Sequence, residues 1–544
     1  MIKITKNEVS EIINVLNRAC KRAVSIKLQG QPSPYYCSLL YRLRGYYTAS
    51  SSYGSVYRTF STDNADVYCD IRVGDYRYDQ TVEGGLQDNS EDAYSYSQVS
   101  VPTDTKELRG LETMLWKLTE AKFKESVSAY RDKESEKIRK INQFGKLSSF
   151  TKLPSIKEIA SIKFEELDEA KLLRLSQKLS LWLSKLPDLA TSWVDIDISR
   201  EVKIFVSSEK RIIALSSQIV SLHGFMKTLS PKGEYLTHNC VLHRVSINEL
   251  PSEATIKKIL QVKYRQLMAS RDGQRLSSFS GPALLMPQPA GLLFHEAIGH
   301  RLEGSRLLSL SEGHTFRNHE DKKVLKLPIT VRDNPCLKSW NDVGCIGSYD
   351  FDDEGTESQD TLLIDKGILK EFLTTRAQIP TRKFRPNGHA RNRRYQRPIS
   401  RMAVTMVESD CGISHEKLKK RLLEEIIKQE QPYGVIIYET GNGETDTSTY
   451  DFQAFSGQIM FATMLYPNGK EIPIRGVDIV GTPLQALSNI IEVGDKLELD
   501  NSYCGAESGS IPVSTISPAI LLSHIELQAK DEELVTPFVL SPPF

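Results

Sequence analysis

Alternating and helically spaced apolar residues divide the first part of the chain into strands and long helices. Residues 35–101 contain alternating runs such as Val67–Val73, which are typical of antiparallel strands with one solvated face. After Pro102, Asp104 can cap a helix. The apolar side of this helix recurs at helical spacing through Leu108, Leu111, Leu115, Leu118 and Phe123. The charged run of residues 122–140 is predicted as its solvated continuation.

A second helix is predicted from Asp168 to Leu186, where Pro187 ends it. Its leucines fall on one stripe: Leu172, Leu175, Leu179 and Leu183. Strands are predicted to resume at residues 194–198 and 202–206. Farther along, residues 414–428 predict another helix, while the glycine-rich segments 441–443 and 505–509 predict hairpin turns.

The pattern changes near residue 275, within a serine-rich segment that spans residues 270–280. Glycine-rich turns and short strands dominate after it. A chain of 544 residues also exceeds what one hydrophobic core usually supports. We therefore predict an α+β fold with two domains. Residues 1–275 are predicted as an amino-terminal α/β domain that contains long helices, and residues 276–544 as a β-rich domain.

Composition and charge narrow the possible partners. Lys and Arg number 70 against 69 Asp and Glu, so the net charge of +1 gives no reason to expect nucleic acid or an anionic membrane as a partner. No run approaches the roughly 18 apolar residues of a membrane span, and the amino terminus does not read as an export signal. Eight cysteines without a Cys-x-x-Cys pattern suit a reducing compartment. We expect a soluble, cytoplasmic protein.

The residues that could bind a metal ion or transfer a proton are concentrated in residues 280–304, whose sequence is SGPALLMPQPAGLLFHEAIGHRLEG. His295, Glu296 and His300 lie within six residues of a segment with helix-forming composition. Neutral imidazoles are good zinc ligands, and a carboxylate beside one can accept a proton from water. The residue types therefore suit a metal-dependent hydrolase.

The spacing of the histidines is unusual, because His295 and His300 are five residues apart. Five steps of about 100° separate two side chains on an α-helix by ~140°, which is too wide for one metal ion. Either the helix is distorted or the motif is not a metal site. A single π-bulge would bring both imidazoles to one face, and Gly299 would tolerate it.

The string HEAIGHRLEG, from His295 to Gly304, resembles the signature of the TldD/PmbA family of zinc metallopeptidases. Similar blocks follow in the family's order, and the resemblance covers residues 280–526. The blocks are Gly347–Tyr349, Asp352–Gly355, Leu363–Leu369, Gly388–Arg391, Pro398–Met402, Phe452–Phe461, Pro473–Gly481, Cys504–Gly505 and Ile511–Val513. Two positions depart from the family pattern: Ser305 stands where Asp is usual, and Ser508-Gly509 replaces a Gly-Gln pair. Neither departure touches a proposed ligand.

A catalytic zinc ion needs three protein ligands and one open position, so a third ligand must join the histidines. Glu303 lies near the same helical face as His300, and Cys504 offers a thiolate, which zinc favours. The resemblance implies Zn²⁺ bound by His295, His300 and Cys504. We assign Glu303 to orienting His300 and Glu296 to the role of general base.

The matched segments supply three further candidates for contact with substrate or with developing negative charge: His389, Arg391 and Arg401. The acidic residues 350–354 lack calcium-loop spacing and are predicted as a turn or a substrate-cleft loop. The resemblance implies that residues 276–544 are a catalytic metallopeptidase domain, which we expect to hydrolyse small peptides or unfolded segments. It also implies a homodimer, or a heterodimer with a family paralogue. The alternative function is a non-catalytic or regulatory subunit of such an assembly.

Overall fold

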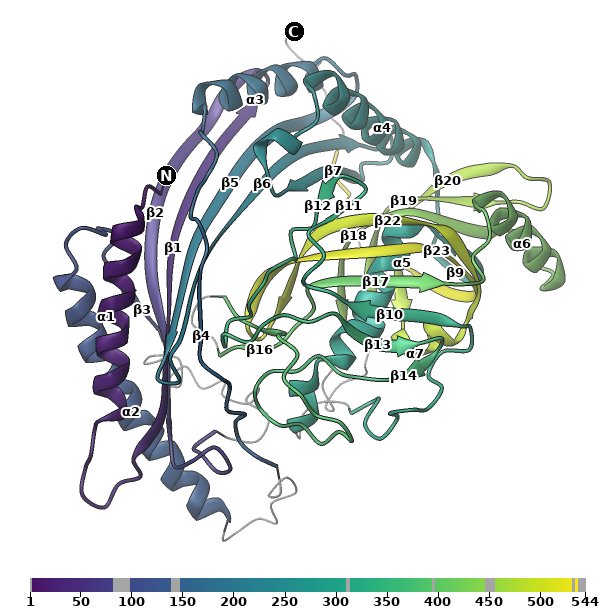
Figure 1. Ribbon diagram of the computed structural model, residues 1–544. Coiled ribbons are helices and arrows are strands. Elements are labelled where there is room, and N and C mark those ends of the chain that lie inside the picture. Colours follow the sequence, from purple (N-terminus) through teal and green to yellow (C-terminus); the bar gives the residue numbers. More distant parts are fainter. Residues whose placement is uncertain are drawn as a thin grey trace.

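The structure is a computed structural model that describes residues 2–81, 98–137, 147–309, 314–393, 397–445, 455–530 and 534–536. Within these residues the chain forms a seven-stranded sheet, a twelve-stranded sheet and the helices that cover them (Figure 1). The predicted α+β fold class is confirmed. Among the described residues, no helix combines the length and the apolar character needed to span a membrane.

The first sheet is antiparallel except at one edge, with strand order β3-β2-β1-β5-β6-β4 and with β7 also paired to β6. The strands are β1 (Pro34–Ser52), β2 (Ser55–Val73), β3 (Gln98–Val101), β4 (Ile156–Ile159), β5 (Leu189–Ser207), β6 (Arg211–Leu229) and β7 (Tyr235–Arg244). The two strands predicted at 194–198 and 202–206 are one continuous strand, β5. Arg200 does not interrupt it, because this buried side chain donates hydrogen bonds to Gln218 and to the Glu165 carbonyl.

Four helices cover the convex face of this sheet (Figure 1): α1 (Lys6–Val24), α2 (Arg109–Lys137), α3 (Glu169–Leu183) and α4 (Glu253–Asp272). Asp168 caps α3 by accepting a hydrogen bond from the Lys171 amide, as its sequence position suggests. The helix predicted after Asp104 begins later, at Arg109, because Asp104 instead accepts from the Lys106 and Glu107 amides and closes a turn. Residues 138–140 of the predicted charged continuation lie outside the described residues.

The second sheet contains a closed ring of strands, in which β23-β9-β18-β19-β21 pair in turn and β21 pairs again with β23. Its strands are β8 (Gln274–Arg275), β9 (Ser278–Leu285), β10 (Ile329–Asp333), β13 (Thr361–Asp365), β14 (Ile368–Leu369), β17 (Val404–Ser409), β18 (Gly434–Thr445), β19 (Phe455–Leu465), β20 (Glu471–Arg475), β21 (Val477–Gly481), β22 (Ile490–Ala506) and β23 (Gly509–Ala529). Smaller elements are the pairs β11 (Ser339–Trp340) with β12 (Val343–Gly344) and β15 (Ala390–Arg391) with β16 (Ile399–Ser400), and the helices α5 (Pro287–Phe294), α6 (His415–Lys428) and α7 (Pro483–Ser488).

The two predicted glycine-rich turns have different outcomes. Residues 505–509 do form a turn, which joins β22 to β23 in a long hairpin. Residues 441–443 do not, because they lie inside β18, where the register with β19 shifts between Thr440 and Gly443. A register shift of this kind accommodates glycine without ending the strand.

The second half of the chain lies on the concave side of the first sheet (Figure 1), and its acidic loop 350–357 contacts that sheet through Phe351. Phe351 packs in a cluster with Leu40, Tyr68, Phe205 and Ile213. All first-sheet strands end before residue 245, and those of the second sheet begin at residue 274. The division into domains at residues 1–275 and 276–544 stays a prediction, and it leaves β8, a strand of the second sheet, in the first part.

Candidate metal centre

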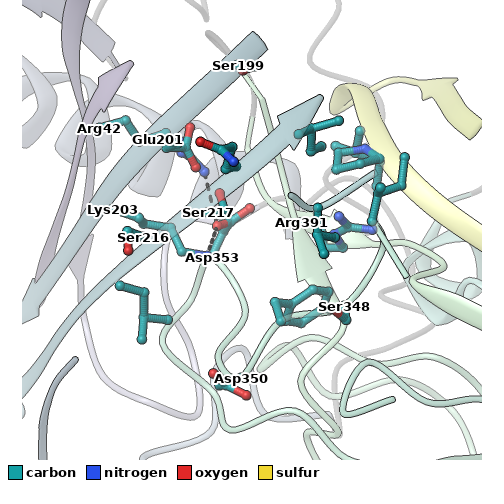
Figure 2. A pocket seen from close by; sticks show the side chains of 18 of the residues that line it. Arg42, Ser199, Glu201, Lys203, Ser216, Ser217, Ser348, Asp350, Asp353 and Arg391 are labelled. Atoms are coloured by element: carbon teal, nitrogen blue, oxygen red, sulfur yellow. Dashed lines mark hydrogen bonds and ion pairs between the residues drawn. The ribbon is translucent and has the colours of Figure 1, made fainter. Parts of the chain in front are cut away.

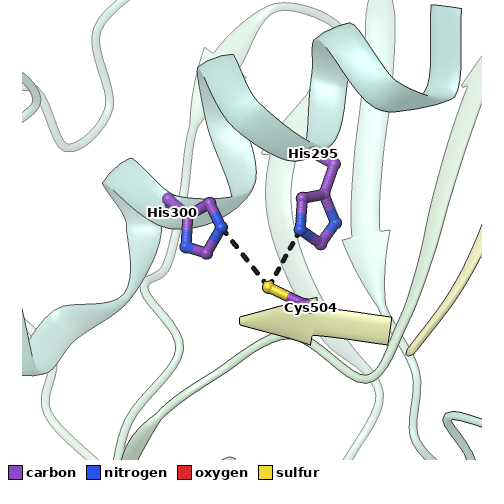
Figure 3. Close-up of side chains that lie close together, drawn as sticks. All are labelled: His295, His300 and Cys504. Carbon is purple, nitrogen blue, oxygen red and sulfur yellow. Dashed lines mark hydrogen bonds between the residues drawn. The ribbon is translucent and has the colours of Figure 1, made fainter. Parts of the chain in front are cut away.

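His295, His300 and Cys504 converge on one point (Figure 3). Nε2 of His295 lies 3.1 Å from Sγ of Cys504, and Nε2 of His300 lies 3.4 Å from the same sulfur. The three candidate donor atoms all lie within 4.8 Å of one another. All three side chains are buried.

The helix that carries the two histidines changes its winding at the motif. Helix α5 ends at Phe294, residues His295–Gly299 form a π-helix, and His300–Leu302 follow as a 3₁₀ turn. The wider turn brings His295 and His300 to one side despite the five-residue spacing. The π-bulge that the spacing required is therefore present. At Gly299, a Cβ atom would lie 1.9 Å from Sδ of Met402, so only glycine fits there without movement.

Gly299→Ala should therefore destabilise the protein. Overpacking of this kind typically costs about 1–3 kcal/mol, and here Met402 or the π-turn must move. Thermal unfolding should show a lower midpoint, and metal content should fall with it. Gly505→Ala is the matched control, because a Cβ atom at Gly505 meets nothing within 4 Å. Equal unfolding midpoints for the two variants would contradict the tight contact at Gly299.

Cys504 reaches the histidines from the distant β22–β23 hairpin, where it pairs with Ile511. Arg401, which is fully buried, holds this hairpin end. Its guanidinium donates to the Cys504 carbonyl at 2.8 Å and Sγ at 3.2 Å, and to Ser508 Oγ at 2.9 Å. Ser508, one of the departures from the family pattern, thus contributes a side-chain acceptor.

Glu303 lies behind His300, on the side away from Cys504. Its Oε1 is 3.2 Å from Nδ1 of His300, and its Oε2 accepts from Nε of Arg306 at 2.9 Å. Burial raises the pKa of Glu303, but His300 and Arg306 outweigh it and bring the pKa down to about 2. Burial lowers the pKa of His300, whereas Glu303 and Cys504 raise it to about 10. Glu303 is thus an anion placed to orient the imidazole.

The donor set fits a zinc ion. In tetrahedral coordination with bonds of about 2.0–2.3 Å, neighbouring donor atoms lie on the order of 3.5 Å apart, close to the two sulfur–nitrogen separations above. The pKa of the Cys504 thiol is well below its usual range. Burial alone would raise this pKa, but the two histidines, His295 and His300, lower it by more. Zinc prefers a thiolate and imidazoles that have lost their protons, so binding would displace the proton that His300 holds in the metal-free site.

Glu296 lies beside the three donors and is also buried. Its Oε2 is 3.9 Å from Nε2 of His300, on the donor side of that ring. Its backbone carbonyl accepts a hydrogen bond from Arg301 at 2.8 Å, which holds this turn of the helix. A carboxylate in this place can exchange a proton with a small molecule that lies between it and the donors.

The structure does not place His389 or Arg391 among the three donors. The ring nitrogens of His389 contact Asn387 at 2.9 Å and Asp333 at 3.1 Å, which joins this segment to the end of β10. Arg391 donates to the Met402 carbonyl and lies over the ring of Tyr349. Arg401 is the only one of these three candidates with a described contact to Cys504.

Sequence reasoning missed Arg306 and Asp333. Arg306 bridges Glu303 to Glu507, with contacts of 3.0 and 3.1 Å to the Glu507 carboxylate. Its spacing three residues after Glu303 was the available signal. Asp333 accepts from the Ala403 amide and the Thr405 hydroxyl as well as contacting His389, and no local pattern marks it.

Fold and site together define a β-rich domain with a buried His/His/Cys centre on a bulged helix. Residues 279–529 match the model of the PmbA/TldA metallopeptidase C-terminal domain, and this half of the chain is a domain of the TldD/PmbA family. The chain is 30% identical over 253 residues to the Metalloprotease TldD homolog of Buchnera aphidicola, a match that covers 45% of this chain and 47% of the relative. The chain thus spans about half the length of this curated relative.

Two solved structures share the fold over almost the entire chain. A Thermotoga maritima protein superposes with a TM-score of 0.63 at 14% identity, over 96% of this chain and 100% of that one. TldE from Thermococcus kodakarensis superposes with a TM-score of 0.58 at 12% identity, again over 96% and 100% of the two chains. The likeness to these structures therefore includes the amino-terminal sheet, which the family model does not cover.

Proposed function

We propose that this protein is a zinc-dependent peptidase that hydrolyses small peptides or unfolded segments. The observation that carries the proposal is the position of Glu296 beside the buried donors His295, His300 and Cys504. The three donors are only 5–7% exposed, which suits a narrow substrate such as an extended peptide better than a folded protein surface. The curated metalloprotease relative supports the same reaction class.

The side chains have separate tasks in this reaction. When bound, a zinc ion supplies Lewis-acid chemistry that polarises a water molecule and the peptide carbonyl. Glu296 accepts a proton from the attacking water as its oxygen bonds to the carbonyl carbon, and it returns the proton to the amine as the C–N bond breaks. Glu303 keeps the His300 ring in place. Arg401 fixes the hairpin that presents Cys504.

The protein is proposed to act in a two-subunit assembly, as a homodimer or with a family paralogue. Its structural likeness to TldE supports this proposal. The competing proposal, a non-catalytic or regulatory subunit, predicts metal binding without activity in the isolated protein. Peptide hydrolysis by the isolated chain, lost with a chelator and restored by zinc, would decide for the enzyme. Size measurement in solution tests the assembly.

The purified protein should contain about one zinc ion per chain, because buried ligation retains metal through dilution. Elemental analysis after purification without chelators measures this content. A protein with no transition metal, and with no gain in stability or activity on adding zinc, would contradict the proposed function.

A further inference from the structure

A cavity of about 530 Å³ lies between the concave face of the first sheet and the second half of the chain (Figure 2). Volumes of about 300–1,000 Å³ are typical of small-molecule sites. One wall consists of β1, β5 and β6, with Ser199 and Ser217 among its side chains. The other consists of residues 348–353, residues 391–393 and the β22–β23 hairpin.

The cavity and the metal centre share the β22–β23 hairpin. Tyr503 lines the cavity, whereas its neighbour Cys504 contacts the two histidines. Ile511, which pairs with Cys504, also lines the cavity. None of the three donors lines it, so a ligand in this cavity lies beside the metal centre and not in it.

Charges on the sheet side of the cavity are paired with one another or with Asp353 of the opposite wall. Arg42 and Lys203 both contact Asp353, at 3.1 and 2.9 Å. Arg44 contacts Glu201 at 2.7 Å. Figure 2 shows Arg42 and Lys203 joined to Asp353, with Arg391 on the opposite side of the cavity. This side needs no further anion for neutrality.

The opposite wall carries two cations that have no carboxylate partner within the described part of the chain. Arg391 is only 7% exposed, and its one hydrogen bond there is from Nη1 to the Met402 carbonyl at 2.7 Å. Arg393 donates from Nη1 to the Ser510 carbonyl at 3.2 Å. Burial lowers the pKa of the Arg391 guanidinium, although Tyr349 opposes the shift. A buried cation of this kind is stabilised by an anion that accepts its remaining donors.

A further donor on the sheet side lacks an acceptor. Nη1 of Arg42 is buried and has no hydrogen-bond partner in the described structure, although Nη2 of the same side chain contacts Asp353 and Asn392. Arg42 itself is 2% exposed. Unsatisfied buried donors are uncommon in native structures and call for a partner. Asp350 and Asp352 also line the cavity, yet its six cationic side chains still outnumber its four carboxylates. The cavity thus combines excess positive charge with unused donors.

We propose that this cavity binds the carboxy-terminal carboxylate of a peptide, with Arg391 as the anchoring cation and Arg393 as a second contact. The requirement for an anion rests on the cavity alone, whereas its identification with a peptide terminus rests on the proposed function. A guanidinium matches the two oxygens of a carboxylate with parallel hydrogen bonds. The site would therefore favour peptides with a free carboxy terminus.

Binding of two matched peptides tests the proposal. Calorimetry would compare N-acetyl-tetra-alanine as the free acid with its carboxy-terminal amide, using the full chain with Glu296→Gln so that turnover does not consume the peptide. Because only the free acid can form charge-assisted hydrogen bonds with Arg391, it should bind at least about tenfold more tightly than the amide. Arg391→Gln should remove this preference and leave the affinity for the amide unchanged.

Arg332→Gln is the control, because Arg332 forms its ion pair with Asp360 and does not line the cavity. Should Arg391→Gln fail to fold, Arg393→Gln serves in its place and should reduce the preference for the acid. Equal affinities for acid and amide, or tight binding of inorganic phosphate without binding of the acid, would overturn the proposal. The binding measurement does not depend on hydrolysis. If the protein prefers the acid but the unsubstituted chain hydrolyses no peptide, only the proposed peptidase function is refuted.

Discussion

Cys504→Ala should leave the purified protein almost free of metal. The substitution removes the only sulfur donor of the cluster and leaves two imidazoles, which hold zinc far more weakly than a complete three-ligand set. Glu303→Gln should have a smaller effect, a loss of about 10–100-fold in metal affinity, because Glu303 contacts His300 through its other ring nitrogen. Elemental analysis and competition with a chromogenic chelator measure both variants.

Cys345→Ala is the control for the removal of a buried thiol, because Cys345 is fully buried in a different cluster. It should retain the wild-type metal content. The order of the two site variants is the decisive result. If Glu303→Gln loses the metal and Cys504→Ala retains it, the centre is of a His/His/Glu type and the β22–β23 hairpin has only a structural role.

Glu296→Gln should abolish peptide hydrolysis while the protein keeps its metal. The amide can still hydrogen-bond a water molecule, but it cannot accept the proton, and general-base catalysis typically contributes about 10²–10⁴-fold to the rate. The carboxylate is not one of the three candidate donors, so metal content should stay the same. Hydrolysis of a fluorogenic peptide and elemental analysis on the same preparation measure both quantities.

Glu371→Gln is the control for this experiment, since Glu371 is partly exposed and pairs with Arg385. It should keep both metal and activity. Undiminished hydrolysis by Glu296→Gln would place the general base elsewhere, and Glu303 would be the next carboxylate to test.

The local part of the candidate site could be predicted from the sequence. His295, Glu296 and His300 lie within six residues, and helix geometry alone left two possibilities, a distorted helix or no metal site. A π-turn at Gly299 was the distortion considered, and the structure contains it. Cys504 could not be found in that way, because 204 residues separate it from His300. Only the resemblance to a family pointed to it. Its position as a donor stays a prediction until metal is measured.

Helices and sheet class were predictable because they depend on periodic patterns within short windows. The start of α2 was not predictable, because Asp104 accepts hydrogen bonds in a turn before the helix. The continuity of β5 was not predictable either, because it depends on the tertiary contact of Arg200 with Gln218. The pairing of Asp353 with Arg42 and Lys203 joins residues from two sheets. No sequence pattern predicts such a contact, so the cavity beside it could not be predicted from the sequence either.

The position of β9 within the second sheet sets the order in which a growing chain can fold. β9 leads into α5, yet its two neighbours are β18 and β23, which begin at Gly434 and Gly509. At roughly 5–20 residues per second, a ribosome needs on the order of ten to forty-five seconds after Leu285 to reach β23. The first sheet, whose strands all lie within residues 34–244, can close during that interval. The nascent chain therefore presents an unpaired apolar strand to chaperones, and the enclosure of α5 is among the last events of synthesis.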